Sequence, residues 1–292
     1  MRNRIYELKK EEFPEKLKNI SNAPKTLFYI GNKKLFYKDS FAIIGSRKIT
    51  EYGKNNCIYF AKEFAYRSIP IVSGLAIGAD SIAHKTVLEN NGETIVVLGH
   101  GLKYIYPKEN EKLLKSIIKN KGLVVTEYNY NIEPNKKNFP KRNRIISALS
   151  DGVLVVEAAY RSGTSITVNY AKKQGKKVFA IPGRLDHYLG IGVNNFIKEG
   201  AILTTKIEDI VKYYPQFINK KSIIKSKKII CTIKEEYKEV YLFLNSEERN
   251  FQEIAQYTGK SIPEILSLLT NMELEGIIKR KSNGNFFVCN TF

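Results

Sequence analysis

Short apolar runs recur between residues 40 and 213, and amphipathic segments separate them. The runs are apolar at every position, which is typical of strands that are buried on both faces of a sheet. After the first run, Cys57, Phe60 and Phe64 fall on one face of a helix. Repeated strand–helix units predict an α/β fold, with a doubly wound, mainly parallel sheet and helices on both sides. The predicted strands are Phe41–Ile44, Ile69–Val72, Thr94–Leu98, Leu123–Val125, Val153–Val156, Val178–Ile181 and Ala201–Leu203.

This α/β pattern defines a domain over residues 39–213, and the rest of the chain divides around it. Residues 1–38 are expected to form a short basic N-terminal segment, and residues 214–234 a basic linker. In residues 235–292, three helical patterns precede two short apolar strands around Ser282-Asn283-Gly284. Because Asn-Gly suits a type I′ turn, this segment predicts three helices and a hairpin, which is a small winged-helix domain.

The chain of 292 residues has a formal net charge of +19, and the charge is unevenly distributed. Residues 1–38 carry +6, residues 39–218 carry +10, residues 219–234 carry +6 and residues 235–292 carry −3. A strongly basic balance indicates a polyanionic partner, and the acidic tail argues against a uniform bias of composition. The third helix expected in that tail, Ile262–Glu275, has three glutamates and no Lys or Arg. A helix that reads the major groove needs cations and amide donors, so this domain is predicted to be a protein-contact or regulatory module rather than a reader of duplex DNA.

Several classes of protein and site are not expected. No apolar run approaches the roughly 18 residues of a membrane span, and the N-terminus lacks the apolar core of a signal peptide. We therefore expect a cytoplasmic protein. The three cysteines and three histidines are isolated from one another, so the sequence predicts no metal site, no cofactor and no catalytic set.

Small and polar residues follow the predicted strands, and the carboxyl ends of parallel strands form the ligand-binding edge of such sheets. In Gly45-Ser46-Arg47, glycine permits a close turn, while Ser46 and Arg47 can donate to a phosphate; a plain surface turn is the alternative. Between Lys136 and Arg144, five cations surround Phe139. This segment suits phosphate binding with base stacking, and the alternative is a core Phe139 under a solvated basic helix.

A further turn at the same edge, Arg161–Ser165, precedes a helix and resembles an anion cradle. N-capping by Thr164 or Ser165 is the plainer interpretation, and the two roles are compatible. Asp80 is expected to cap the helix that includes His84. The carboxylate of Glu157 is interpreted as an anchor for Arg142 or Arg144 rather than as a catalytic acid or base.

Six motifs occur between Thr26 and Ile210: GSRKITEYG, SGLAIGADSIAH, TIVVLGHGLKYIYPKEN, TEY, FPKRNRIISALSDGVLVVEAAYRSGTSIT and VFAIPG. In this order they resemble the DNA-processing protein A family, DprA or Smf. The resemblance implies an extended Rossmann fold that binds single-stranded DNA without catalysis. It also implies a recombination mediator of natural transformation, which protects incoming single strands, displaces single-strand-binding protein and loads the RecA recombinase.

The resemblance also assigns residues to sites. It implies a homodimer formed near Asn194–Leu203, with Ile197 and Leu203 as contacts. Three features depart from the family. About 38 residues precede the first predicted strand, so the N-terminal sterile-alpha-motif-like domain of longer members is not expected here. Ile77 stands where many members have arginine, and the segment RLDHYLGIGVNN after Gly183 differs from the usual pattern. The implied DNA pocket consists of Ser46, Arg47, Lys136, Phe139, Arg142, Asn143, Arg144, Gly163, Thr164 and Ser165.

The alternative function is that of a nucleotide-binding Rossmann protein, either a glycosidic hydrolase of nucleoside monophosphates or a nucleotide sensor. The turn at Arg161–Thr164 distantly resembles the Gly-Gly-x-Gly-Thr-x-x-Glu turn of such hydrolases. However, Thr167 stands where that turn requires glutamate. This difference argues against hydrolysis.

Overall fold

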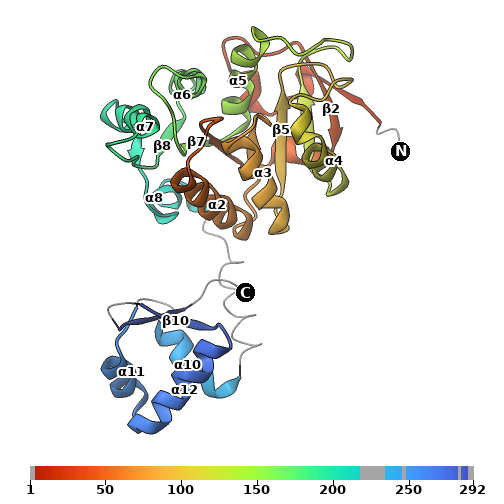
Figure 1. Cartoon of the computed structure of the whole chain (residues 1–292). Helices are drawn as coiled ribbons and strands as arrows, with labels where there is room; N and C mark the ends of the chain where they lie inside the picture. The colour runs from red at the N-terminus through yellow and green to blue at the C-terminus, as the bar shows by residue number, and fades with distance from the viewer. Residues whose placement is uncertain (1–3, 218–233, 245–247, 282–283, 289–292) are drawn as a thin grey trace. The chain divides into compact units, whose positions relative to one another are not determined.

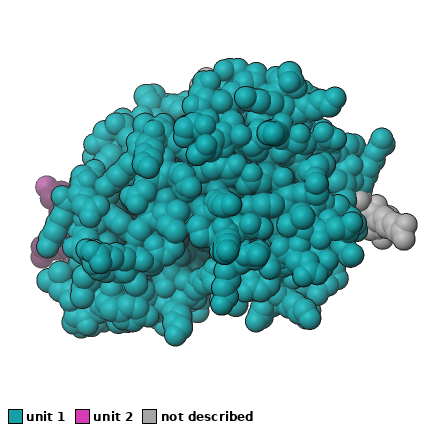
Figure 2. All heavy atoms as spheres, turned by 90° about the horizontal axis from the view of Figure 1, so that it is seen from above, with its two compact units in different colours: residues 1–219 teal, residues 220–292 magenta. Residues whose placement is uncertain are grey.

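The structure, a computed structural model, describes residues 4–217, 234–244, 248–281 and 284–288. It divides into two compact units, Met1–Asn219 and Lys220–Phe292, which Figure 2 colours separately. Each unit has its own core of buried apolar side chains. The expected linker, residues 214–234, lies mostly outside the described residues, but its first part does not. Pro215–Phe217 form a short 3-10 helix, and Phe217 is buried against Phe41 in unit 1.

Unit 1 contains a nine-stranded sheet among the described residues, in the order β1-β2-β6-β5-β4-β3-β7-β8-β9. Neighbouring strands from β6 to β9 run parallel, so the predicted α/β fold with a mainly parallel sheet is confirmed. The strands are β1 Tyr6–Lys9, β2 Thr26–Gly31, β3 Phe41–Ile44, β4 Ile71–Ser73, β5 Thr94–Leu98, β6 Leu123–Thr126, β7 Gly152–Val155, β8 Lys177–Ala180 and β9 Ile202–Leu203.

The N-terminal segment is part of this sheet rather than a separate basic arm. β2 pairs antiparallel with β6, placing Phe28 opposite Thr126, and β1 pairs antiparallel with β2. Burial alternates along β2, so Leu27 and Tyr29 face the core while their neighbours are partly exposed. A strand that is buried on one face shows this period of two, which differs from the continuous apolar runs of the central strands.

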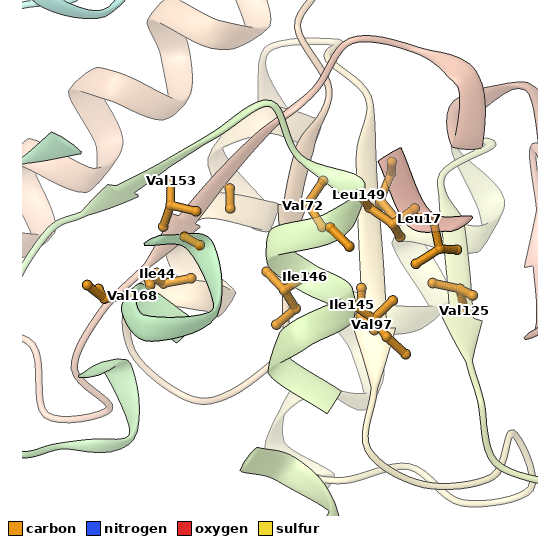
Figure 3. Close-up of a cluster of buried hydrophobic side chains, with 14 of the residues drawn as sticks. Leu17, Ile44, Val72, Val97, Val125, Ile145, Ile146, Leu149, Val153 and Val168 are labelled. Carbon is orange, nitrogen blue, oxygen red and sulfur yellow. The ribbon is translucent and has the colours of Figure 1, made fainter. Parts of the chain in front are cut away.

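Helices cover both faces of the sheet (Figure 1). On one face, α1, α5, α6 and α7 share a hydrophobic cluster with β-strand residues such as Ile44 and Val97. Figure 3 shows part of this cluster, including Ile145 and Ile146 of α5. The other face is covered by α2, α3 and α8 in a second cluster, and by α4 in a third. The helices are α1 Glu15–Lys18, α2 Glu51–Tyr66, α3 Ala79–Glu89, α4 Glu111–Lys119, α5 Asn138–Leu149, α6 Gly163–Lys173, α7 Tyr188–Lys198 and α8 Glu208–Val211.

The strand order reverses between β3 and β7. From β3 the chain builds outward through β4, β5 and β6, whereas β7, β8 and β9 extend in the opposite direction. In open α/β sheets, the crevice beyond the carboxyl ends of two such strands is the usual place for a ligand. The loops after Ile44 and Val155 therefore flank the position where a site is expected.

Unit 2 contains three helices, α10 Glu235–Leu244, α11 Phe251–Thr258 and α12 Ile262–Leu274. They pack against an antiparallel pair, β10 Ile278–Arg280 and β11 Phe286–Val288, around a core that includes Tyr237 and Met272. This is the predicted succession of three helices and a hairpin. The predicted type I′ turn involves Ser282 and Asn283, which lie outside the described residues. Among the described helices, none has the length and apolar character needed to cross a membrane.

Candidate nucleic-acid interface

A cavity of about 590 Å³ opens at the predicted place, between the loop after β3, the loop after β7 and the first turns of α5 and α6. We call it the switch-point pocket. Arg144 and Ser165 are absent from its wall. The residues of the predicted DNA pocket that do line it are Ser46, Arg47, Lys136, Phe139, Arg142, Asn143, Gly163 and Thr164.

The turn after β3 holds Arg47 at the mouth of this pocket. The Ser46 amide donates to the Glu157 carbonyl at 2.8 Å, and the Ser46 hydroxyl accepts from the Lys48 amide at 3.0 Å. Gly78 permits this close packing, because a Cβ there would lie 2.4 Å from the Ser46 carbonyl oxygen. Arg47 itself is exposed, and no ion pair of its guanidinium occurs within the described residues. A rigid turn therefore presents a free cation.

Glu157 does not anchor an arginine, so that interpretation was wrong. Its carboxylate accepts from the Thr50 amide at 2.9 Å and from the Thr50 hydroxyl at 2.6 Å. Thr50 is the N-cap of α2. Glu157 follows β7, the neighbour of β3 in the sheet, so its side chain meets the helix that β3 leads into. The buried carboxylate thereby stabilises the start of α2 instead of facing the pocket.

Arg142 forms the inner wall of the pocket and is 5% exposed. Its guanidinium donates to the Gly74 carbonyl at 2.9 Å and to the Val97 carbonyl, which joins the ends of β4 and β5. Burial lowers the pKa of Arg142 to about 10, while the charge of Asp80 opposes that effect. Arg142 therefore links the ends of β4 and β5 from a buried position in the pocket wall.

Asp80 has a different role from the predicted helix cap. The N-cap of α3 is Gly78, and Asp80 lies in the first turn. Its carboxylate accepts from the Gly74 amide at 3.1 Å and from the Ala76 amide at 3.2 Å, which closes the turn after β4. Burial raises the pKa of Asp80, and the positive charge of Arg142 opposes that effect. Asp80 and Arg142 are thus two buried residues of the pocket wall whose opposite charges attract each other, although no salt bridge between them occurs among the described residues.

An aromatic pair lines one side of the pocket. Phe139, in the first turn of α5, stacks on Tyr106 with ring centroids 5.4 Å apart and planes at 26°. Gly99 permits this position, because a Cβ there would lie 2.8 Å from the Phe139 ring. Tyr106 is 44% exposed. It lies within the motif TIVVLGHGLKYIYPKEN, but it was not assigned to the pocket because its position there depends on stacking with Phe139, which is distant in the sequence. Lys136 is exposed at the rim beside Phe139.

The N-terminus of α6 forms the opposite side. Ser162 is the N-cap, but no side chain caps the first turn, so capping by Thr164 or Ser165 is not observed. The helix begins one residue before Thr164, which places both hydroxyl residues inside the first turn. First-turn amides have no partner within a helix, and the helix dipole makes this end attract anions. Gly163 and Thr164, whose amides belong to this first turn, both line the pocket.

Arg144 faces away from the pocket. Its guanidinium forms a two-pronged pair with Glu127, with both contacts at 2.6 Å, and donates to the Asn22 carbonyl at 2.7 Å. Burial acts to lower the pKa of Arg144, but its pairing with Glu127 raises it overall. The prediction that Arg144 lies in the same pocket was therefore wrong. The carboxylate that holds it directly follows β6, a pairing in space that the sequence does not reveal.

The pocket as a whole is electropositive. Arg47, Lys48, Lys136 and Arg142 line it together with one carboxylate, Asp80. Two cations at the mouth, uncapped helix amides on one side and stacked rings on the other can hold a phosphate and an adjacent flat base. Among the described residues, no group of three His, Cys, Asp or Glu side chains could hold a metal ion.

The chain is similar to known proteins over most of its length. The family model for DNA recombination-mediator protein A matches residues 4–215. Protein Smf from Escherichia coli K12 is 34% identical over 281 residues, covering 94% of this chain and 74% of that protein. DNA processing protein DprA from Streptococcus pneumoniae is 42% identical over 199 residues, covering 68% of this chain and 70% of that protein.

Two solved structures resemble the chain. DNA processing protein A from Streptococcus pneumoniae superposes with a TM-score of 0.68 at 40% identity, covering 71% of this chain and 74% of that one. DNA processing protein A from Helicobacter pylori, described for its single-stranded DNA binding mode, superposes with a TM-score of 0.65 at 32% identity. That alignment covers 73% of this chain and 96% of the other.

Proposed function

This chain belongs to the family of DNA recombination-mediator protein A, and from that premise we propose that it binds single-stranded DNA in the switch-point pocket. The observation that carries the proposal is the meeting of free cations, uncapped helix amides and a stacked aromatic pair in one cavity. The description of the Helicobacter pylori relative as a single-stranded DNA binder supports it.

The chemistry of binding is positional. Arg47 and Lys136 neutralise phosphates at the mouth, and the amides of Gly163 and Thr164 donate to a phosphate oxygen. Phe139, supported by Tyr106, stacks on a base, which is tolerant of sequence because every base has a flat face. Arg142 holds the floor in place through the ends of β4 and β5. The function of the pocket is therefore to bind and hold a strand, without a catalytic step.

At the level of the cell, the proposed role is that of a cytoplasmic recombination mediator. It protects incoming single strands during natural transformation and loads RecA onto them. A homodimer through Ile197 and Leu203 is part of this proposal. Leu203 is 51% exposed on the edge strand β9, and Ile197 is partly buried against the core. Unit 2, interpreted as a winged-helix domain, is proposed to contact a protein partner.

The direct test is fluorescence anisotropy with a labelled single-stranded oligonucleotide, competed by duplex of equal length over a series of salt concentrations. We expect a strong preference for the single strand and a steep salt dependence, because bound phosphates release counterions. Equal, weak binding of both forms would contradict the proposal and favour nonspecific attraction to the basic chain.

A matched pair of lysines makes the test specific to the pocket. Lys136→Ala should weaken binding by about 1–2 kcal/mol, since a charge-assisted contact is lost. Lys137→Ala removes the same charge from an exposed neighbour that does not line the pocket, and should change binding much less. Equal losses in the two variants would show that charge in this region acts nonspecifically.

A further inference from the structure

A second cavity, of about 430 Å³, lies at the other end of α6. Its wall comes from α1, the loop that follows α1, the outer face of α5, the last turn of α6 and the approach to β8. No residue of this wall also lines the switch-point pocket. The wall consists of Lys16, Asn19, Ile20, Ser21, Asn22, Arg144, Tyr170, Lys173, Gln174 and Lys176.

The charges around this second cavity do not balance. Lys16 and Arg144 each have a carboxylate partner, Asp151 at 3.5 Å and Glu127 at 2.6 Å respectively. Lys173 is exposed and Lys176 is half-buried, and neither forms an ion pair within the described residues. Two positive charges of the wall are therefore left without a carboxylate of their own.

Lys176 shows the imbalance most clearly. Burial lowers the pKa of its ammonium group, the charge of Asp151 opposes that effect, and the charge of Lys16 adds to it. Asp151 already accepts from the Ser40 amide at 2.8 Å besides its pairing with Lys16. Asp151 is thus the carboxylate whose charge acts on both ammonium groups, while Asp39 also acts on Lys16. A bound anion would place negative charge beside Lys176, which forms no ion pair within the described residues.

The second cavity continues the switch-point pocket along the same two helices. On α6, Ile166 lines the first pocket, and Tyr170, one turn later on the same face, lines the second. On α5, Asn143 lines the first and the adjacent Arg144 lines the second. The Gln174 amide bridges these helices by donating to the Arg144 carbonyl at 3.0 Å. The two cavities therefore lie along the seam between α5 and α6.

We propose that Lys173 and Lys176 form a second phosphate-binding site at the far end of the α5–α6 seam. Tyr170 supplies an aromatic wall and Ser21 a hydroxyl donor beside it. The phosphate belongs either to the backbone of a strand that runs along the seam from the switch-point pocket or to a free phosphorylated molecule. The first source rests on the proposed function, whereas the second does not.

The test compares oligonucleotides of two lengths, about four and about sixteen nucleotides, which span the range of single-strand site sizes. The variant is Lys173→Gln/Lys176→Gln, which removes both charges and keeps the side-chain stems. Binding of the longer strand should weaken roughly tenfold, with a salt slope shallower by about 1.4, because two phosphate contacts are lost. Binding of the shorter strand should not change. The control is Lys112→Gln/Lys119→Gln on α4, two exposed lysines on the other face of the sheet.

Titration with thymidine 5′-monophosphate separates the two sources. If the double variant no longer gives the heat of monophosphate binding but still binds both oligonucleotides as the unmodified protein does, the site is assigned to a free phosphorylated molecule. Unchanged binding of both oligonucleotides and of the monophosphate would overturn the second site.

Because Lys176 is half-buried, the single variant Lys173→Gln, at an exposed position, repeats the test if the double variant folds poorly. Failure of the unmodified protein to bind either oligonucleotide would instead overturn the proposed function, and the monophosphate would then decide the second site alone.

Discussion

At the scale of single residues, Arg142 and Arg144 show why cations close together in the sequence can have different roles. Both lie on α5, but a helix turns about 100° per residue, so two residues apart they face opposite sides. Arg142 donates to the Gly74 carbonyl at the end of β4, near the charge of Asp80, whereas Arg144 forms an ion pair with Glu127. The sequence predicts a basic helix at this edge, but not which carboxylate each arginine meets, because those partners come from distant loops.

Arg142→Ala tests whether this arginine supports the pocket from within. The variant leaves Asp80 buried without its cation and the Gly74 and Val97 carbonyls without their donor. A buried polar group left without its partner costs about 1–3 kcal/mol, so we expect unit 1 to lose at least about that much stability. Urea unfolding, with hydrogen exchange in peptides from residues 1–219, measures it. A variant as stable as the unmodified protein but weak in DNA binding would return Arg142 to the role of a direct phosphate contact.

The lowered pKa of the buried His84 should make the stability of unit 1 depend on pH. Burial, with a smaller effect from the charge of Arg142, lowers the pKa of His84 from 6.5 to about 3. The unfolded chain then binds a proton near pH 6.5 that the folded chain binds only near pH 3. The stabilisation is complete above 6.5 and is lost as the pH falls, by about 1.4 kcal/mol per pH unit.

Between pH 6.5 and pH 5 this histidine should account for a loss of about 2 kcal/mol in the free energy of unfolding. His84→Gln should flatten that part of the profile, since glutamine does not titrate. Urea unfolding at a series of pH values compares the two proteins. Parallel profiles would show that other groups cause the acid sensitivity.

At the scale of elements, the strands differ in how well the sequence predicts them. β3, β5 and β7 are buried along their length and were predicted as continuous apolar runs. β1 and β2 were missed, because each is buried at only one or two positions and lysines lie near both in the sequence. β1 is also the edge strand of the sheet. The position of the pocket was predictable for the same reason as the central strands, since it depends on their carboxyl ends. Tyr106 was not, because its place depends on stacking with a distant residue.

The start of α6 offers a test of backbone contact. A Cβ at Gly163 would meet nothing within 4 Å, so Gly163→Ala is tolerated by the fold, and alanine favours a helix. A phosphate seated on the first-turn amides would meet the new methyl group. We expect unchanged or slightly higher stability, together with binding of single-stranded DNA weakened about tenfold, or ~1.4 kcal/mol. Thermal unfolding and anisotropy measure the two effects, and unchanged affinity would show that the strand does not approach this turn.

At the scale of the whole molecule, the C-terminal domain differs from unit 1 in net charge, and its helix α12 exposes apolar side chains. The switch-point pocket and the second cavity both belong to unit 1, whereas residues 235–292 carry a net charge of −3. The described α12 has no Lys or Arg, yet Ile262, Leu266 and Leu274 are 62%, 52% and 81% exposed on it. An apolar and acidic helix suits a protein surface better than a DNA phosphate backbone.

Removal of residues 235–292 tests this division of roles. The truncated chain keeps the basic residues 219–234, and it loses a net negative charge, so attraction to DNA should not decrease. We expect the affinity for single-stranded DNA to stay within about twofold of that of the full chain, with a similar salt slope. Anisotropy with the same oligonucleotide compares the two proteins, and circular dichroism checks that unit 1 remains folded. A loss of tenfold or more, with unit 1 intact, would mean that unit 2 contacts the strand itself, and α12 would then need a DNA-binding role that its glutamates oppose.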